Sequence, residues 1–127
     1  MYYIHQSYKT SDRKEWSPLW TLLQKSWIDQ SGETFRYVFW TDRENDLLAE
    51  CTQFKELYFH LDPGIKRANV ARMMYLWKFG GLYVDLNFIA LRNPIDLINQ
   101  FPDEVLFLQR RYIYKSLLTN QNNSMCF

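Results

Sequence analysis

Residues 67–87 read RANVARMMYLWKFGGLYVDLN, a stretch that places a helix pattern, a glycine stop and a strand pattern in succession. Asp62 is a good N-cap and Pro63 suits a first helical turn, while the glycine pair at 80–81 supplies the positive φ that ends helices. We therefore expect a helix over residues 63–79. Its apolar residues lie on nearly every face, which predicts a helix enclosed by other elements.

Two polar residues, Asn69 and Arg72, interrupt this apolar helix. Because they are three residues apart, their side chains are neighbours on one face. Donors on a buried or half-buried helix need hydrogen-bond partners, and a bound ligand is one such partner. Arg72 also has a structural alternative, an ion pair with Asp85 that holds the helix to the following strand.

After the glycines the sequence period changes to two, which predicts a strand. One face of this strand is expected to carry Leu82, Val84 and Leu86, and the other Tyr83, Asp85 and Asn87. Asp85 and Asn87 therefore share a face where the strand ends. Two oxygen-bearing side chains at this spacing can approach a cation such as Mg²⁺ or Mn²⁺ and its phosphate oxygens. Ligands of open α/β sheets bind at such strand ends.

The first half of the chain predicts two strands, each followed by a helix. Residues 2–6 and 35–40 have the composition of buried strands. Ser17 as N-cap and Pro18 in the first turn predict a helix after the first strand. Residues 43–51 predict a short helix after the second. This alternation predicts an α/β fold with a mainly parallel sheet.

These two helices are each expected to turn an apolar face inward. The expected inward residues are Leu19, Leu22, Leu23 and Trp27 in the first helix, and Leu47, Leu48 and Cys51 in the second. Further along, residues 95–100 predict a short helical turn and residues 105–109 a late strand. The polar residues 119–127 are expected to form a loose tail.

Four blocks of this sequence, in order, resemble glycosyltransferase family 32, which includes yeast α-mannosyltransferases and animal α-galactosyltransferases. The family pattern is Arg-Ala-Asp-x-x-Arg followed by Tyr-Gly-Gly-x-Tyr-x-Asp-x-Asp. The matching blocks here are IHQSYKT at 4–10, FWTD at 39–42, RANVAR at 67–72 and FGGLYVDLN at 79–87. The resemblance extends over residues 3–94.

The resemblance implies a nucleotide-diphospho-sugar transferase (GT-A, Rossmann-like) fold in minimal or truncated form, with residues 1–127 as one domain that supplies the donor-binding half. It implies a metal-dependent, retaining transfer of a hexose from a UDP- or GDP-sugar to a glycan, protein or other acceptor, with Mn²⁺ or Mg²⁺ as cofactor. The implied catalytic residues are Asp85 and Arg72, and the implied metal ligands are Asp85 and Asn87. The implied substrate-binding residues are His5, Gln6, Trp40, Thr41, Asn69, Arg72, Gly81, Tyr83 and Asp85.

Some of these residues also have purely structural alternatives. His5 has the pattern of a hydrogen-bonded core histidine, and residues 40–42 that of a strand end followed by a helix cap, with Asp42 as the cap.

The sequence departs from the family pattern at Asn69 and Asn87, where the family has carboxylates. An amide oxygen still coordinates a cation, but each change removes one formal charge, which weakens metal binding and can alter the preferred sugar. The alternative function is therefore a catalytically weak or inactive protein that binds nucleotide sugars.

Amino-acid composition and charge limit the possible partners and the cellular location of the protein. The 127 residues carry a net charge of +1 with both signs interleaved, which gives no field for nucleic acid. Cys51 and Cys126 have no ligands nearby in sequence and are expected to be free thiols. No apolar run reaches the roughly 20 residues of a membrane span, and no signal segment is seen, so we expect a cytoplasmic protein. Anchored family members reside in the Golgi.

Overall fold

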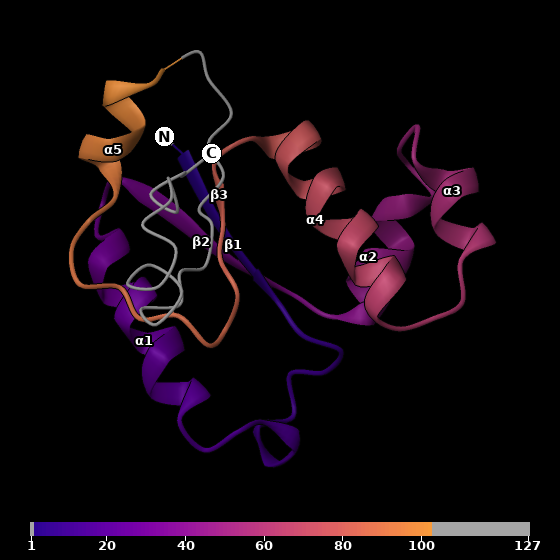
Figure 1. The fold of residues 1–127 in the computed structure, drawn as a ribbon, viewed down its shortest axis with the longest axis horizontal. Helices are drawn as coiled ribbons and strands as arrows, with labels where there is room; N and C mark the ends of the chain where they lie inside the picture. Colours follow the sequence, from indigo (N-terminus) through magenta and orange to yellow (C-terminus); the bar gives the residue numbers. More distant parts are fainter. Residues whose placement is uncertain (1, 103–127) are drawn as a thin grey trace, which may run out of the picture. The chain divides into compact units, whose positions relative to one another are not determined.

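A computed structural model of the chain describes residues 2–102. It divides the chain into two compact units, residues 1–93 and residues 94–127, which are described separately. The elements of the first unit (Figure 1) are β1 (Tyr2–Ser7), a 3₁₀ turn (Arg13–Glu15), α1 (Trp20–Ser31), β2 (Phe35–Trp40), α2 (Asp42–Ala49), α3 (Lys55–His60), α4 (Ile65–Phe79) and β3 (Leu82–Tyr83). The described part of the second unit contains α5 (Ile95–Gln100).

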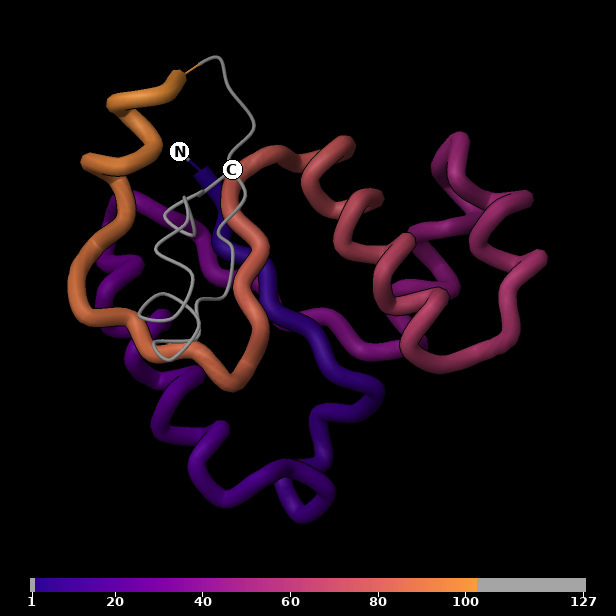
Figure 2. Tube along the Cα trace, in the orientation of Figure 1, coloured from indigo at the N-terminus to yellow at the C-terminus, as the bar shows by residue number. Residues whose placement is uncertain are grey.

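The three strands form one parallel sheet in the order β2-β1-β3. The pairing of β1 with β2 runs from Tyr2 opposite Phe35 to Ser7 opposite Trp40. Both strands therefore end at the same edge, next to α2, as the trace in Figure 2 shows. The prediction of an α/β fold with a parallel sheet is confirmed.

β3 contains only two residues, although the sequence predicts a strand that continues to Asn87. The chain turns after β3, where the Phe88 N–H donates to the Asp85 carbonyl at 3.3 Å. The alternation continues through this turn, since Val84 and Leu86 are buried as predicted. At the start of β3, a Cβ on Gly81 would lie 2.1 Å from the Tyr3 carbonyl oxygen. Only glycine therefore permits this close approach to β1.

The predicted inner faces of the first two helices are only partly correct: Trp27 is buried as predicted and Leu23 is half-buried, but other predicted residues are not. Leu19 and Leu22 are exposed, while Gln24, Trp27 and Ser31 are the buried residues of α1. The burial of the polar Gln24 side chain is compensated, because its amide donates a hydrogen bond to the Tyr37 hydroxyl at 3.1 Å. The buried face of α1 therefore includes a hydrogen-bonded polar residue, which the apolar pattern does not predict.

The same correction applies to α2. Leu47 and Cys51 are exposed and Leu48 is half-buried, whereas Asn45 and Ala49 are buried. The Oδ1 atom of Asn45 accepts a hydrogen bond from the Tyr75 hydroxyl, which satisfies its burial. Thr41, not Asp42, is the N-cap of this helix.

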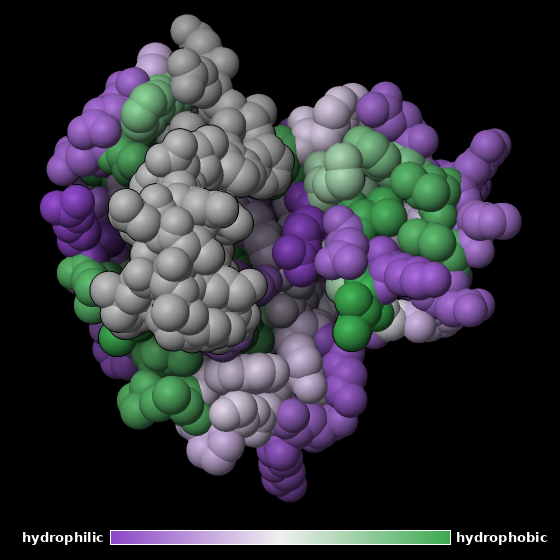
Figure 3. Space-filling model, viewed as in Figure 1, coloured by the Kyte–Doolittle hydropathy of each residue, from purple (hydrophilic) through white to green (hydrophobic). Residues whose placement is uncertain are grey.

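The helix α4 ends as predicted at Gly80, whose N–H donates to the Leu76 carbonyl at 2.9 Å. It begins at Ile65, because Gly64, with φ 125°, occupies the N-cap position. The prediction that α4 is enclosed on all sides is wrong, since Met73 and Trp77 are 56% and 57% exposed. Figure 3 shows apolar surface over this region of α3 and α4.

The buried face of α4 forms the centre of a core with α2 and α3. The core residues are Ala49, Tyr58, Val70, Ala71, Met74 and Tyr75. The indole of Trp40, at the end of β2, stacks on the Tyr75 ring with centroids 4.5 Å apart. This contact joins the helical core to the sheet.

Two further predictions concern the end of the chain. The helical turn at 95–100 is confirmed as α5. The predicted strand at 105–109 and the tail at 119–127 lie outside the described residues, and the single-domain assignment stays a prediction. The helix α3 was not predicted from the sequence. No helix within residues 2–102 has both the length and the apolar character to cross a membrane.

Candidate functional site

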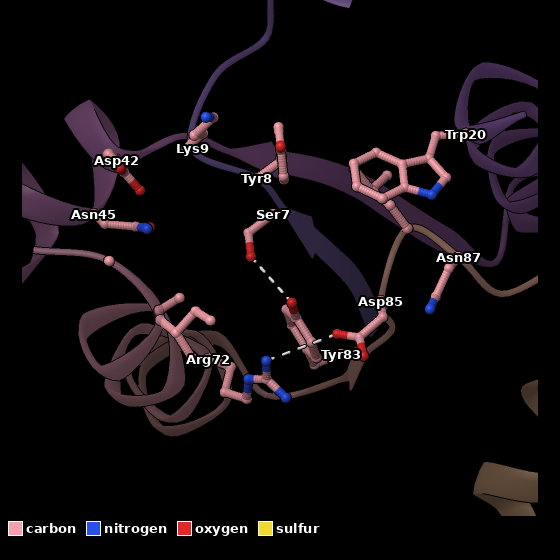
Figure 4. Close-up of a pocket in the computed structure, with 14 residues that line it drawn as sticks. Ser7, Tyr8, Lys9, Trp20, Asp42, Asn45, Arg72, Tyr83, Asp85 and Asn87 are labelled. Carbon is pink, nitrogen blue, oxygen red and sulfur yellow. Dashed lines mark hydrogen bonds and ion pairs between the residues drawn. The ribbon is translucent and has the colours of Figure 1, made fainter. Parts of the chain in front are cut away.

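A cavity of about 480 Å³ lies in the first unit at the carboxyl ends of the strands. Its lining comes from the segments that follow β1 and β3 and from the first turns of α1, α2 and α4. Figure 4 shows these side chains around the cavity. This is the edge of a parallel sheet where ligands of open α/β folds bind.

Four of the predicted site residues line this cavity: Arg72, Tyr83, Asp85 and Asn87. The Nη2 atom of Arg72 lies 3.7 Å from Oδ1 of Asp85, and both side chains are partly exposed. The Arg72 guanidinium lies over the Tyr83 ring, 4.6 Å from its centroid. The Nε of Arg72 is buried and has no hydrogen-bond partner among the described residues. Arg72 is therefore held in place with donor capacity unused.

Tyr83 and Asp85 are fixed by contacts with β1 and with the turn after β3. The hydroxyls of Tyr83 and Ser7 lie 3.0 Å apart. Burial raises the pKa of Tyr83, so its phenol stays protonated at neutral pH. The Asp85 carbonyl accepts from the Gln6 amide at 3.2 Å and from the Phe88 N–H. The Asp85 backbone is thus anchored while its carboxylate faces the cavity.

Neither His5 nor Gln6 lines the cavity, since both are fully buried beneath it. The Nδ1 atom of His5 lies 3.1 Å from the indole N–H of Trp40, a group that can only donate. The His5 proton must therefore lie on Nε2, which donates to the Gly80 carbonyl at 2.8 Å. This is the geometry of the core-histidine alternative. Nucleotide binding by His5 and Gln6 stays a prediction.

Four other predicted residues also lie outside the cavity lining. Trp40 is packed in the aromatic core, and Thr41 donates its hydroxyl to the Glu44 carboxylate. Asn69 is exposed on α4, and Gly81 forms the close contact of β3 with β1. Their roles in binding stay predictions.

Most of the remaining lining residues were not predicted from the sequence. Ser7 is the last residue of β1, and Tyr8 and Lys9 follow it. Their position at the end of a predicted strand was a signal that could have identified them. Trp20 begins α1, which starts later than its predicted cap, so nothing in the pattern pointed to it.

Two helix starts contribute the other missed residues. Asp42 and Asn45 come from the first turn of α2, and Gly64, Ile65 and Ala68 from the start of α4. Asp42 has a raised pKa, chiefly because burial disfavours its charged form and then because of Asp46 nearby.

Comparison with known proteins shows the family to which the chain belongs. Residues 17–107 match the family described as glycosyltransferase sugar-binding region containing DXD motif, and the chain belongs to this family. Inositol phosphoceramide mannosyltransferase 3 of Schizosaccharomyces pombe is 33% identical over 101 residues, which cover 78% of this chain and 27% of the relative. Lactosylceramide 4-alpha-galactosyltransferase of Mus musculus is 41% identical over 46 residues, which cover 36% of this chain and 11% of the relative.

A mannosyl phosphorylinositol ceramide synthase of Saccharomyces cerevisiae is 33% identical over 86 residues, covering 66% of this chain and 22% of the relative. The matched part of this chain spans only about a quarter of the length of the mannosyltransferase relatives. No solved structure matches the chain.

Proposed function

We propose that this chain forms the donor-binding part of a glycosyltransferase that transfers a hexose from a nucleotide-diphosphate sugar to a saccharide or another acceptor. The names of the relatives, which are mannosyl- and galactosyltransferases, support glycosyl transfer. The arrangement of Arg72, Tyr83 and Asp85 around one cavity carries the proposal. A GT-A fold is consistent with a cavity at the carboxyl ends of parallel strands.

Arg72 is assigned to the diphosphate and the sugar. Its guanidinium is planar, permanently charged and matched in shape to phosphate oxygens. The Tyr83 ring fixes the plane of that group, and the buried Nε lacks a protein partner within the described residues. An oxygen atom of the nucleotide-diphosphate sugar would be the hydrogen-bond acceptor that this N–H requires. Asp85 then accepts hydrogen bonds from sugar or ribose hydroxyls.

A divalent cation fits the part of the cavity that Asp85 and Asn87 line. Asp85 and Asn87 both line it and offer one carboxylate and one amide oxygen. Within residues 2–102, no group of three or more His, Cys, Asp or Glu residues is placed so that it could hold a metal ion. The pair of Asp85 and Asn87 suits Mg²⁺ or Mn²⁺, because such a cation takes its other ligands from substrate phosphates and water. When bound, the cation neutralises charge on the departing diphosphate, so we propose metal-dependent transfer. We also propose that transfer retains the anomeric configuration.

Hydrolysis of the donor tests this proposal without an identified acceptor. The released sugar is measured with UDP- and GDP-sugars in the presence of Mn²⁺, for the wild type and for Asp85→Asn. We expect slow hydrolysis in the wild type and loss of it in the variant. Asp29→Asn is the matched control, because Asp29 pairs with Lys25 on the exposed side of α1. Equal rates in both variants would contradict the assignment.

A second function, nucleotide-sugar binding with little or no turnover, is favoured by the amides at Asn69 and Asn87. The double change Asn69→Asp and Asn87→Asp distinguishes the two. Turnover that appears only in the double variant would identify the chain as an inactive binding protein. Reduced turnover would show that the amides belong to the mechanism.

A further inference from the structure

One end of the cavity has no assignment in the proposed function. Figure 4 shows Asp42 and Asn45 on one side of the cavity, and Trp20 and Asn87 on the opposite side. Arg72 and Tyr83 lie between them. With the diphosphate at Arg72 and the cation at Asp85 and Asn87, as proposed above, the α2 end of the cavity is left for the nucleoside.

Asn45 is a buried side chain with a fixed orientation at this end. It is 2% exposed, and its Oδ1 accepts from the hydroxyl of Tyr75, which is itself fully buried. The Trp40 indole stacks on the Tyr75 ring with centroids 4.5 Å apart. The Asn45 amide nitrogen makes no hydrogen bond within residues 2–102, and the side chain extends toward the cavity (Figure 4). Asn45 therefore presents an N–H donor to a ligand.

Asp42 presents the complementary acceptor, three residues away on the same helix. Its carboxylate lines the cavity, and within the described part of the chain it forms neither a hydrogen bond nor an ion pair. Lys9 and Arg67 act on it only through longer-range attraction. Both carboxylate oxygens are thus available for N–H groups.

The wall beside this pair is apolar. Ile65 lines the cavity yet is 81% exposed, and Ala68 lies one turn further along α4. A flat ring lying against these two side chains would cover apolar surface that is otherwise in contact with water. The α2 end therefore combines a donor, a double acceptor and an apolar wall.

From this arrangement we propose that the α2 end of the cavity is a nucleobase subsite that selects guanine. The Asp42 carboxylate accepts the two adjacent N–H groups of guanine, at N1 and at the 2-amino group, and the Asn45 amide donates to O6. Uracil offers a single N–H between two carbonyls, one of which faces the second Asp42 oxygen unfavourably. Adenine has an amino group but no ring N–H on this edge. This inference rests on the proposed function and specifies its donor.

The test is calorimetric titration of the full chain, with Mn²⁺, by the diphosphates of guanosine, inosine, xanthosine and uridine. Inosine lacks the 2-amino group, so the wild type should bind its diphosphate about tenfold or more weakly than GDP, the loss typical of a hydrogen bond to a charged group. Asp42→Asn should weaken GDP binding by a similar factor. It should also shift preference toward xanthosine diphosphate, whose 2-carbonyl accepts from the new amide.

Glu44→Gln is the matched control, because it removes one negative charge from the same helical turn at a residue outside the cavity lining. It should leave the ratio of GDP to inosine diphosphate affinity unchanged. Equal affinity for UDP and GDP, or an unchanged base preference in Asp42→Asn, would overturn the guanine subsite and leave the proposed function standing. Failure of every nucleoside diphosphate to bind would overturn both.

Discussion

Arg72 and Asp85 lie next to each other in the lining of the cavity, with Nη2 and Oδ1 3.7 Å apart. This exceeds the roughly 2.7–2.9 Å of a charge-assisted hydrogen bond. The two side chains are 40% and 48% exposed, so solvent screens their attraction and the pair adds little to stability. Both groups therefore keep hydrogen-bonding capacity for a ligand.

Arg72→Lys should weaken binding of UDP- and GDP-sugars by about tenfold or more, because a lysine cannot reproduce the planar pair of donors. The free energy of unfolding should change by less than about 1 kcal/mol, since the ion pair is screened. Calorimetric titration and urea unfolding measure the two quantities on the same preparation.

Arg67→Lys is the matched control for Arg72. The Nε of Arg67 donates to the carbonyls of Leu61 at 2.8 Å and Tyr58 at 3.2 Å, and the residue does not line the cavity. This change should lower the free energy of unfolding by about 1 kcal/mol and leave donor affinity unchanged. The reverse pattern, with Arg72 affecting stability alone, would make Arg72 a structural residue.

Asn87→Asp should tighten Mn²⁺ binding, because a second carboxylate adds charge beside Asp85. Metal titration, followed by calorimetry or by the paramagnetic resonance of Mn²⁺, measures this. Asn69→Asp provides the comparison, since Asn69 is exposed and lies outside the cavity lining, and it should leave Mn²⁺ affinity unchanged. Equal effects of the two changes would argue against a cation at Asp85.

Acidification should destabilise the fold through His5. Burial lowers the pKa of His5 below its ordinary value of 6.5, so the unfolded chain binds more protons than the folded chain as pH falls through this range. The stability that neutral His5 contributes is present above the unfolded pKa and is lost as pH falls toward the folded pKa.

The free energy of unfolding in urea should therefore be lower at about pH 5.5 than at about pH 7.5 in the wild type. This difference should be smaller in His5→Gln. His60→Gln should keep the full loss, because His60 is exposed at the end of α3. A loss of the same size in His5→Gln would show that another group is responsible.

Gly81→Ala should destabilise the first unit by roughly 2 kcal/mol or more, because the new Cβ meets the Tyr3 carbonyl and the backbone φ is 94°. Gly32→Ala has a φ of 52° but open space around its Cβ, so it should cost only about 1 kcal/mol. Thermal unfolding of both variants measures the difference. Equal losses would show that β3 moves away from β1 without penalty.

The sequence predicted the backbone elements better than the faces they bury. The strand at 35–40 and the glycine stop after Phe79 were correct, because alternation and positive-φ glycines are local signals. The inner faces of α1 and α2 were only partly correct: Trp27 is buried as predicted, but Gln24 and Asn45 are buried through partners distant in sequence. A pattern of apolar residues does not reveal such pairs.

The residues of the candidate site were also only partly predicted from the sequence. Arg72, Tyr83, Asp85 and Asn87 were predicted and line one cavity, since they follow from one helix, one strand and their order. Asp42 and Asn45 were not predicted as site residues. Their position depends on how α2 packs against α4, which only the tertiary structure reveals.

Direct titration of the full chain with GDP- and UDP-sugars, first with Mn²⁺ and then with a chelator, tests the central claim. We expect saturable binding that weakens when the cation is removed and when Arg72 is replaced by lysine. The absence of binding by any donor, with and without Mn²⁺, would contradict it and leave the cavity without a donor-binding function.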